Sequence, residues 1–322
     1  MKSTHAIRAL IGISLLTSAA AFGQRPQGPP TDTVAPNIPG VVAGGTKVQF
    51  IKDGFEGTEG PIGLPDGTFI FTETNASRIT KIAPDGSTST YLDNTNGSNG
   101  LALDSEGRLI SVQTVPGNAK VGVIHPKGSE KVLAENFEGK PFGRPNDLVV
   151  DKKGGVYFTE PANVDKPALP ASVYYIRPNG SIARVAEGIT FPNGIQLSPD
   201  EKTLYVNDAQ GPHLIAFDVQ ADGALTNQRN FGNYEGVAKT ATGVRSGADG
   251  LAIDSEGRIY SGTMAGVEVF SPQGKHLGTI PVSRAPQNLA FAGTDKKTLY
   301  IVGRGCAFKV QMLAQGFQGR AK

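Results

Sequence analysis

The sequence predicts an all-β fold, a six-bladed β-propeller closed by a strand from the N-terminal part of the chain. One pattern occurs six times at separations of 38 to 56 residues: a polar residue, a small residue, a short apolar run, a tight turn and a β-branched or aromatic run. Such periods are typical of propellers. The 42 glycines and 22 prolines among 322 residues disfavour helical bundles. No segment keeps helical spacing of apolar residues for more than a turn or two.

Residues 1–23 precede the repeats and read as a secretory signal peptide. Lys2 and Arg8 give a positive start, an uncharged apolar stretch follows, and the small residues Ala21 and Gly23 stand before a cleavage point at Gln24. The apolar stretch is shorter than the roughly 20 residues that a membrane anchor needs. We therefore expect a protein that is periplasmic or secreted, with no membrane attachment after cleavage.

Residues 24–45 are rich in Pro and Gly and show no periodicity. This composition predicts a linker. The catalytic or binding domain is then expected over residues 46–322.

The six copies of the pattern predict the blades in order. The copies begin at the following residues: Glu59, Asn99, Asn146, Asn193, Asp249 and Gln287. Each copy has room for four strands, but the last one ends a strand short. Residues 47–52 (KVQFIK) form an unassigned strand before the first copy. We expect this strand to complete the last blade, because that pairing removes two open sheet edges at once.

The charge balance and the cysteine count exclude several classes of protein. The chain has 31 basic and 29 acidic residues, so a nucleic-acid partner is not expected. The single cysteine, Cys306, excludes an intrachain disulfide and a Cys-rich metal site. Nothing in the sequence requires more than a monomer.

The six residues that begin the copies would face the propeller axis from the first strand of each blade. All six carry a carboxylate or a carboxamide. For any one copy, Asn-Gly or Asp-Gly is an ordinary turn dipeptide. Glu59 and Gln287 at the same register do not fit a turn requirement, however, and they favour a ring of side-chain oxygens. We call these six residues the axial ring.

A ring of oxygen donors without His or Cys is typical of a site for a hard cation. Calcium accepts six to eight oxygen ligands in irregular geometry. Glu59 and Asp249 would balance the charge of one divalent ion. We expect one divalent cation, with calcium favoured and magnesium or zinc as alternatives.

The motifs TEGP, GRPND, FPNGI and ADGLAID, one per blade in that order, resemble the senescence marker protein/gluconolactonase family of six-bladed lactonases. The resemblance spans about residues 50–310. It implies that Glu59, Asn193 and Asp249 are metal ligands. It also implies that Asn146 completes the metal site or contacts substrate, and that Arg144 contacts substrate.

The resemblance implies an exported, metal-dependent hydrolase of a sugar lactone such as glucono-1,5-lactone, or of a similar ester. Asp249 is the expected base for the attacking water, with direct attack by its carboxylate as the alternative. Asn99 is expected to bind substrate or to support the ligands by hydrogen bonds. Two other functions stay open: a non-catalytic propeller that binds a partner on its rim, and a metal-dependent phosphotriesterase or arylesterase.

Two further groups of residues are expected near the ring. Glu73, Glu160 and Asp208 each end a second strand, where we expect them to bond loop backbone. The insertions at residues 162–171 and 234–247 are long enough to cover a pocket.

Overall fold

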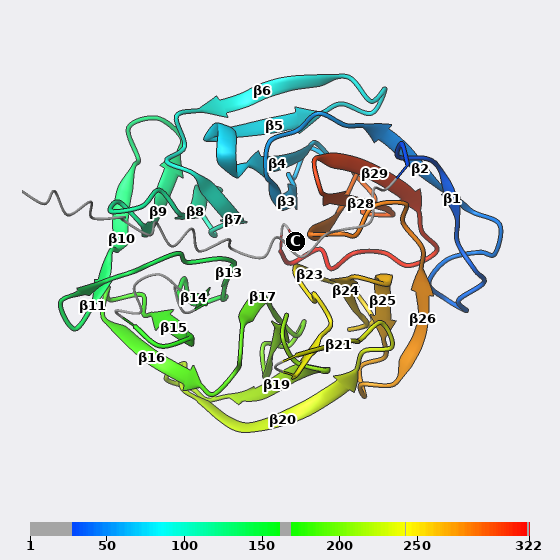
Figure 1. Cartoon of the computed structure of the whole chain (residues 1–322). Helices are drawn as coiled ribbons and strands as arrows, with labels where there is room; N and C mark the ends of the chain where they lie inside the picture. The colour runs from blue at the N-terminus through cyan, green and yellow to red at the C-terminus, as the bar shows by residue number, and fades with distance from the viewer. Residues whose placement is uncertain (1–27, 162–168, 242, 321) are drawn as a thin grey trace, which may run out of the picture.

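The structure, a computed structural model, describes residues 28–161, 169–241, 243–320 and 322. Five four-stranded antiparallel sheets and one five-stranded sheet lie around a central axis (Figure 1). Within the described residues the helical structure is one short 3-10 helix, η1 (Thr74–Ala76), and no helix there is long and apolar enough to cross a membrane. The predicted six-bladed propeller is confirmed. The expected signal peptide (residues 1–23) lies outside the described residues.

The first three blades are consecutive in the chain. Their strands are β3 (Thr58–Gly63), β4 (Phe69–Glu73), β5 (Arg78–Ile82) and β6 (Thr88–Asp93) in blade 1; β7 (Ser98–Leu103), β8 (Leu109–Gln113), β9 (Lys120–His125) and β10 (Lys131–Ala134) in blade 2; and β13 (Leu148–Val150), β14 (Val156–Glu160), β15 (Ser172–Ile176) and β16 (Ile182–Glu187) in blade 3. In each blade the first strand lies innermost (Figure 1).

The last three blades follow the same plan. Their strands are β17 (Pro192–Leu197), β18 (Thr203–Asp208), β19 (His213–Val219) and β20 (Leu225–Asn233) in blade 4; β23 (Leu251–Ile253), β24 (Ile259–Thr263), β25 (Gly266–Phe270) and β26 (His276–Ile280) in blade 5; and β27 (Asn288–Ala292), β28 (Thr298–Gly303), β29 (Cys306–Gln311), β2 (Lys47–Lys52) and β1 (Thr33–Val34) in blade 6.

Blade 6 closes the propeller as the sequence predicts. β2 pairs antiparallel with β29, with Val48 opposite Val310 and Phe50 opposite Phe308. The pairing gives the last blade its fourth strand. β1 then adds a fifth strand, which pairs with β2 through Val34 and Lys47.

The burial of each strand explains its composition. Every residue of β4 and β14 is buried, and each strand begins with three apolar or aromatic residues without alternation. The outermost strands β6 and β16 have no buried residue, and they are more polar. Apolar clusters between neighbouring blades make up the core. Cys306 is buried in one of them as a free thiol.

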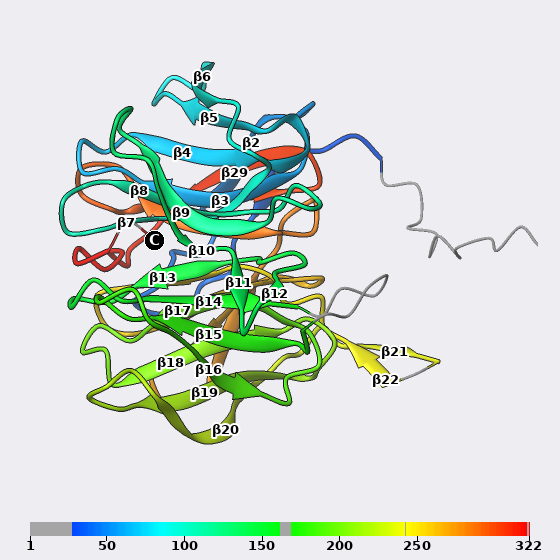
Figure 2. The same cartoon turned by 90° about the vertical axis from the view of Figure 1, so that its left-hand side faces the viewer.

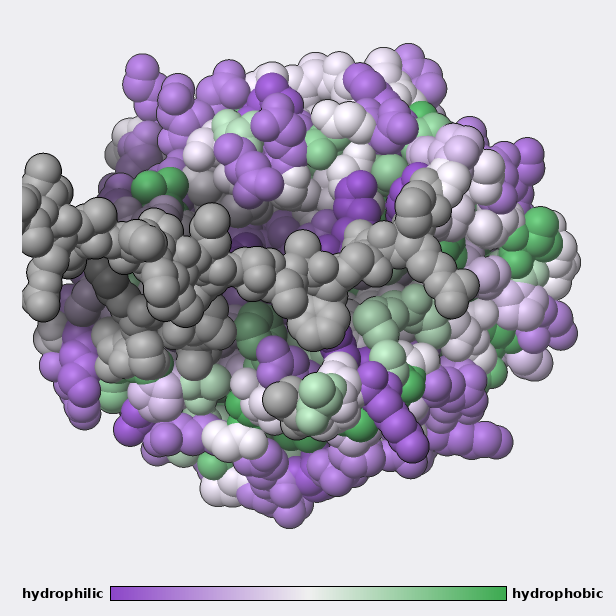
Figure 3. Space-filling model, viewed as in Figure 1, coloured by the Kyte–Doolittle hydropathy of each residue, from purple (hydrophilic) through white to green (hydrophobic). Residues whose placement is uncertain are grey.

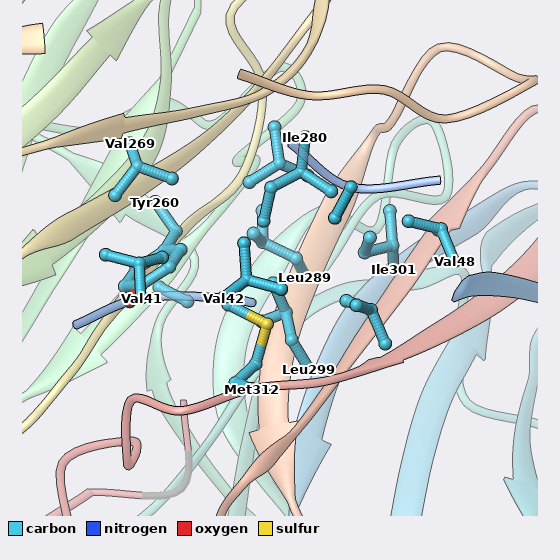
Figure 4. Close-up of a cluster of buried hydrophobic side chains, with 14 of the residues drawn as sticks. Val41, Val42, Val48, Tyr260, Val269, Ile280, Leu289, Leu299, Ile301 and Met312 are labelled. Atoms are coloured by element: carbon cyan, nitrogen blue, oxygen red, sulfur yellow. The ribbon is translucent and has the colours of Figure 1, made fainter. Parts of the chain in front are cut away.

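Residues 28–45 differ from the expected linker, because they pack against the propeller. Ile38, Val41 and Val42 are 2% exposed or less, in a cluster with Leu289 and Met312 (Figure 4). Three apolar side chains stand among the Pro and Gly residues of this segment, and residues of blades 5 and 6 bury them. Burying a large aliphatic side chain contributes about 1.5–3 kcal/mol, so these contacts hold the segment in place.

The two faces of the propeller carry different additions. A hairpin of β21 (Ala238–Thr240) and β22 (Gly243–Arg245) projects from one face (Figure 2). A second hairpin, β11 (Asn136–Phe137) and β12 (Lys140–Pro141), connects blades 2 and 3. The end of the chain lies at the other face, close to the axis (Figures 1 and 2). We call these the hairpin face and the tail face.

Candidate metal centre

The axial ring occupies the same register in every blade. Glu59, Asn99 and Asn193 are the second residues of β3, β7 and β17. The other three ring residues stand one or two positions before the inner strands of their blades: Asn146, Asp249 and Gln287. All six therefore begin the innermost strands, as the repeated sequence pattern predicts.

Glycines after four of the ring residues let neighbouring blades approach closely. A Cβ atom at Gly194 would lie 2.1 Å from the Asp249 carbonyl oxygen, and one at Gly60 would lie 2.0 Å from the Asn99 carbonyl oxygen. The Gly194 N–H donates a hydrogen bond to that Asp249 carbonyl at 3.0 Å. Glycine is therefore required here by packing between blades. Because Asn99 and Asn193 lie within strands, their Asn-Gly pairs are not turn dipeptides.

Three side-chain oxygens of the ring are buried without a hydrogen-bond donor among the described residues: Asn99 Oδ1, Asn193 Oδ1 and Asp249 Oδ1. An unsatisfied buried polar group costs about 1–3 kcal/mol. Most buried polar groups in proteins are paired, so three such acceptors in one ring indicate a site for a positively charged ligand.

The two ring carboxyls are electrostatically strained without such a ligand. Burial raises the pKa of Glu59 to about 7, although the Asn288 side-chain amide opposes the shift by donating to Oε2 at 3.2 Å. Burial also raises the pKa of Asp249 well above its usual value, and the negative charge of Glu59 adds to the shift. A cation between the two carboxylates would reverse these shifts.

Gln287 orients Glu59. Its Oε1 accepts hydrogen bonds from Thr58 Oγ1 at 3.1 Å and from the Arg304 N–H at 2.7 Å. These two donors fix the amide so that Nε2 faces Glu59 Oε1, at 3.4 Å. The roles of Asn288, Thr58 and Arg304 were not predicted from the sequence. The one available signal was the polar pair Gln287–Asn288 at the ring position.

Arg144 lies beside the ring on a loop that Glu160 holds. The buried Glu160 Oε1 accepts the backbone N–H groups of Arg144 at 2.8 Å and Gly143 at 3.0 Å. Arg144 itself is exposed. Burial raises the pKa of Glu160 to about 7, and its Oε2 is buried without a hydrogen-bond donor in the described structure.

The predicted bonding of the second-strand carboxylates to loop backbone is confirmed. Besides Glu160, Glu73 accepts the Glu56 N–H at 3.0 Å. Asp208 accepts the N–H groups of Thr190 and Phe191 at 3.2 and 2.9 Å. Each carboxylate thus holds the loop that leads into the inner strand of its own blade. In the first insertion, residues 162–168 lie outside the described residues. The second insertion contains the two strands of the projecting hairpin, β21 and β22.

The donor set of the ring fits a hard divalent cation. Within the described residues no group of three or more His, Cys, Asp and Glu side chains could hold a metal ion. The ring combines two carboxylates with amide oxygens, and such oxygen donors suit calcium or magnesium better than zinc. At the centre of the hairpin face, hydrophilic residues line the hollow above the grey atoms and hydrophobic residues lie below them (Figure 3).

Comparisons with known proteins agree on one family. The model of the family described as "SMP-30/Gluconolactonase/LRE-like region" matches residues 57–304. A gluconolactonase of Zymomonas mobilis is 27% identical over 293 residues, which cover 83% of this chain and 82% of that protein. A solved gluconolactonase structure from Xanthomonas campestris is 30% identical with a TM-score of 0.76, covering 89% of this chain and 99% of that one. Regucalcin of Agrobacterium tumefaciens, at 19% identity and a TM-score of 0.68, shares the fold.

Proposed function

The chain belongs to the SMP-30/gluconolactonase/LRE-like family and is a hydrolase of the lactonase type, and from this premise we propose that it opens a sugar lactone at the axial ring with the help of one divalent cation. Glucono-1,5-lactone is the proposed substrate. The observation that carries the proposal is a set of three buried ring oxygens without a donor among the described residues, one of them on Asp249, together with the raised pKa of Asp249 and of Glu59.

Four ring residues would hold the cation: Glu59, Asn146, Asn193 and Asp249. Asn99 lies in the same ring and presents a further buried oxygen without a donor, which suits a contact to the cation or to a substrate hydroxyl. Calcium is the proposed ion because the ligands are oxygens and the site mixes charged and neutral donors. When bound, such an ion polarises the lactone carbonyl and lowers the pKa of water.

Three side chains have further roles in the proposed hydrolysis: Asp249, Arg144 and Glu160. Asp249 accepts the proton of the water that attacks the carbonyl carbon. The bond from that carbon to the ring oxygen then breaks, and the leaving ring oxygen takes the proton from Asp249. Arg144 is exposed at the ring and has the planar donor array that suits substrate hydroxyls or a carboxylate. Glu160 keeps Arg144 in position through its backbone N–H. Direct attack by the Asp249 carboxylate is the alternative, and trapping of an acyl-enzyme would reveal it.

The test is a pH-indicator assay on glucono-1,5-lactone, corrected for spontaneous hydrolysis. It compares calcium-loaded wild type, wild type in chelator, Asp249→Asn and the exposed control Asp222→Asn. We expect a loss of at least about 100-fold in chelator and in Asp249→Asn, with no loss in the control. Full activity of Asp249→Asn would exclude Asp249 as base. No lactone hydrolysis with the ion bound would favour another ester, including a phosphotriester or an aryl ester. Absence of both hydrolysis and ion binding would favour a rim-binding scaffold.

We also propose that the protein is exported. The composition of residues 1–23 supports cleavage before Gln24. N-terminal sequencing of the protein from fractionated cells should give a chain that starts at Gln24 in the periplasm or the medium. An intact N-terminus in the cytoplasmic fraction would contradict the proposal.

A further inference from the structure

The last residues of the chain cross the tail face of the propeller and are held there by backbone hydrogen bonds. The Phe317 N–H donates to the Ile253 carbonyl at 3.1 Å, and the Gln315 carbonyl accepts the Ser255 N–H at 2.8 Å. The Leu313 N–H donates to the Val41 carbonyl at 2.9 Å. The tail is thus part of the folded domain.

Two basic residues anchor the tail beside the central channel. The Arg320 guanidinium donates to the carbonyls of Leu197 and Ser198 at 2.6 and 2.7 Å, and it pairs with Glu201 at 2.9 Å. The Lys322 carbonyl accepts a hydrogen bond from Gln196 Nε2 at 3.3 Å. Leu197 and Gln196 belong to β17, the inner strand of blade 4. These contacts bring Lys322 to the wall of the channel.

The Lys322 ammonium forms a buried ion pair with Asp147. The two side chains are 5% and 1% exposed. Asp147 directly follows the ring residue Asn146, and its Oδ1 would lie 2.6 Å from a Cβ atom at Gly100, the residue after Asn99. The pair therefore lies just behind the axial ring, on the tail side.

Lys322 also acts on the ring carboxyls. Burial raises the pKa of Glu59 and of Asp249, the charge of Asp147 raises both further, and the charge of Lys322 lowers both. Among the described side chains, the Asp147 carboxylate and the Lys322 ammonium thus act on both ring carboxyls, while the charge of Arg144 lowers the pKa of Glu59 and the charge of Arg304 lowers that of Asp249.

We propose that Lys322 is the internal counter-cation of the channel: it neutralises Asp147, so that the two ring carboxylates, Glu59 and Asp249, are left to balance one divalent ion. This inference rests on the proposed metal site. A buried ion pair by itself adds little stability compared with apolar side chains of the same size. Its effect on cation binding is the property that distinguishes this role from a purely structural one.

The test measures calcium affinity by titration calorimetry on chelator-stripped protein, in wild type, Lys322→Met, Asp147→Asn and the double variant. Removing the ammonium should tighten binding about tenfold and removing the carboxylate should weaken it about tenfold, because each changes the charge near the ring by one unit in a buried setting. The double variant should return to within about threefold of wild type. Lys275→Met, at an exposed turn between β25 and β26, is the matched control and should leave affinity unchanged.

Each outcome decides the inference. A calcium affinity that is the same in all variants, or that weakens alike in both single variants, overturns the role of Lys322 while the metal site of the proposed function stands. Wild type that binds no divalent cation overturns that metal site, and the inference with it. If Lys322→Met does not fold, the comparison of Asp147→Asn with the double variant replaces it: adding the lysine substitution must tighten binding about tenfold.

Discussion

The two ends of the central channel differ in the partners that their buried polar groups have. At the hairpin face, Asn99, Asn193 and Asp249 bury oxygens that no donor of the described residues satisfies. At the tail face, Asp147 is paired with Lys322, and Arg320 reaches two carbonyls and a carboxylate, with its Nε left without an acceptor among the described residues. Unsatisfied buried acceptors reduce stability, so a protein retains them where a ligand completes them. The contrast favours ligand binding at the hairpin end, whereas at the tail end the chain itself pairs the buried carboxylate of Asp147.

The largest expected effect concerns the tail end. Lys322→Met should lower the free energy of unfolding by about 3–5 kcal/mol, because it leaves the Asp147 carboxylate buried and unpaired. Urea denaturation in chelator measures the loss. Adding Asp147→Asn should restore most of the stability. If Lys322→Met alone is as stable as wild type, the ion pair with Asp147 does not stabilise the tail end.

At the hairpin end, ionisation of a buried carboxyl should destabilise the protein, whereas the ion pair at the tail end stabilises it. The pH dependence of stability should reveal this difference. The pKa of Glu59 is about 7 in the folded protein, above its usual 4.5, so the folded state binds the proton more tightly than the unfolded chain. Stability in chelator should therefore fall as pH rises from about 4.5 to 7, by up to about 3 kcal/mol from this group.

The control for this pH effect is Glu59→Gln. In this variant the free energy of unfolding, measured by urea denaturation at each pH, should lack the decrease that Glu59 contributes. Calcium should also remove it in wild type, because a bound ion holds the carboxylate ionised. An identical pH dependence in wild type and Glu59→Gln, both in chelator, would contradict the raised pKa of Glu59 in the folded protein.

Close packing between blades near the ring should be sensitive to a single methyl group. A Cβ atom at Gly250 would lie 1.9 Å from Asn288 Oδ1, and Asn288 is the residue that donates to Glu59. Gly250→Ala should cost about 1–3 kcal/mol of stability and weaken calcium binding. Gly28→Ala, where a Cβ atom meets nothing within 4 Å, is the control. Unchanged stability and affinity in Gly250→Ala would show that the ring does not depend on this contact.

The smallest effect should come from loosening Glu59 without removing it. Gln287→Ala removes the amide that faces Glu59 Oε1 and should weaken calcium binding about tenfold, as other residues that orient metal ligands do. Stability in chelator should change little. Calorimetric titration measures the calcium affinity. An unchanged affinity would show that Gln287 only accepts the backbone N–H of Arg304 and does not orient Glu59 for metal binding.

The sequence predicts the hairpin end well because that end is built from repeats. Six copies of one pattern place Glu59 and Asp249 at equivalent positions, and the copies also predict the number of blades and the closing role of residues 47–52. Gly194 and Gly250 follow ring residues because of contacts between blades, and a pattern within one blade does not reveal that reason.

The contacts at the tail end could not be predicted from the sequence, because the residues of the tail belong to no repeat. Lys322 follows a short segment rich in Gly and Gln, and its partner Asp147 is 175 residues away in the chain. Residues 28–45 read as a linker for a similar reason: Ile38, Val41 and Val42 stand among Pro and Gly, and blades 5 and 6 together provide the surface that buries them. The roles of the ring residues in metal and substrate binding stay predictions.

The proposed metal site is tested most directly by a calcium titration of chelator-stripped protein in which bound ion and lactone hydrolysis are measured together. We expect the rate of hydrolysis to rise in proportion to binding and to reach its maximum at one ion per chain. Asp249→Asn should show no such rise. Full hydrolysis by the stripped protein, or saturation of binding without any gain in rate, would contradict the claim that the axial ring holds the ion that hydrolysis requires.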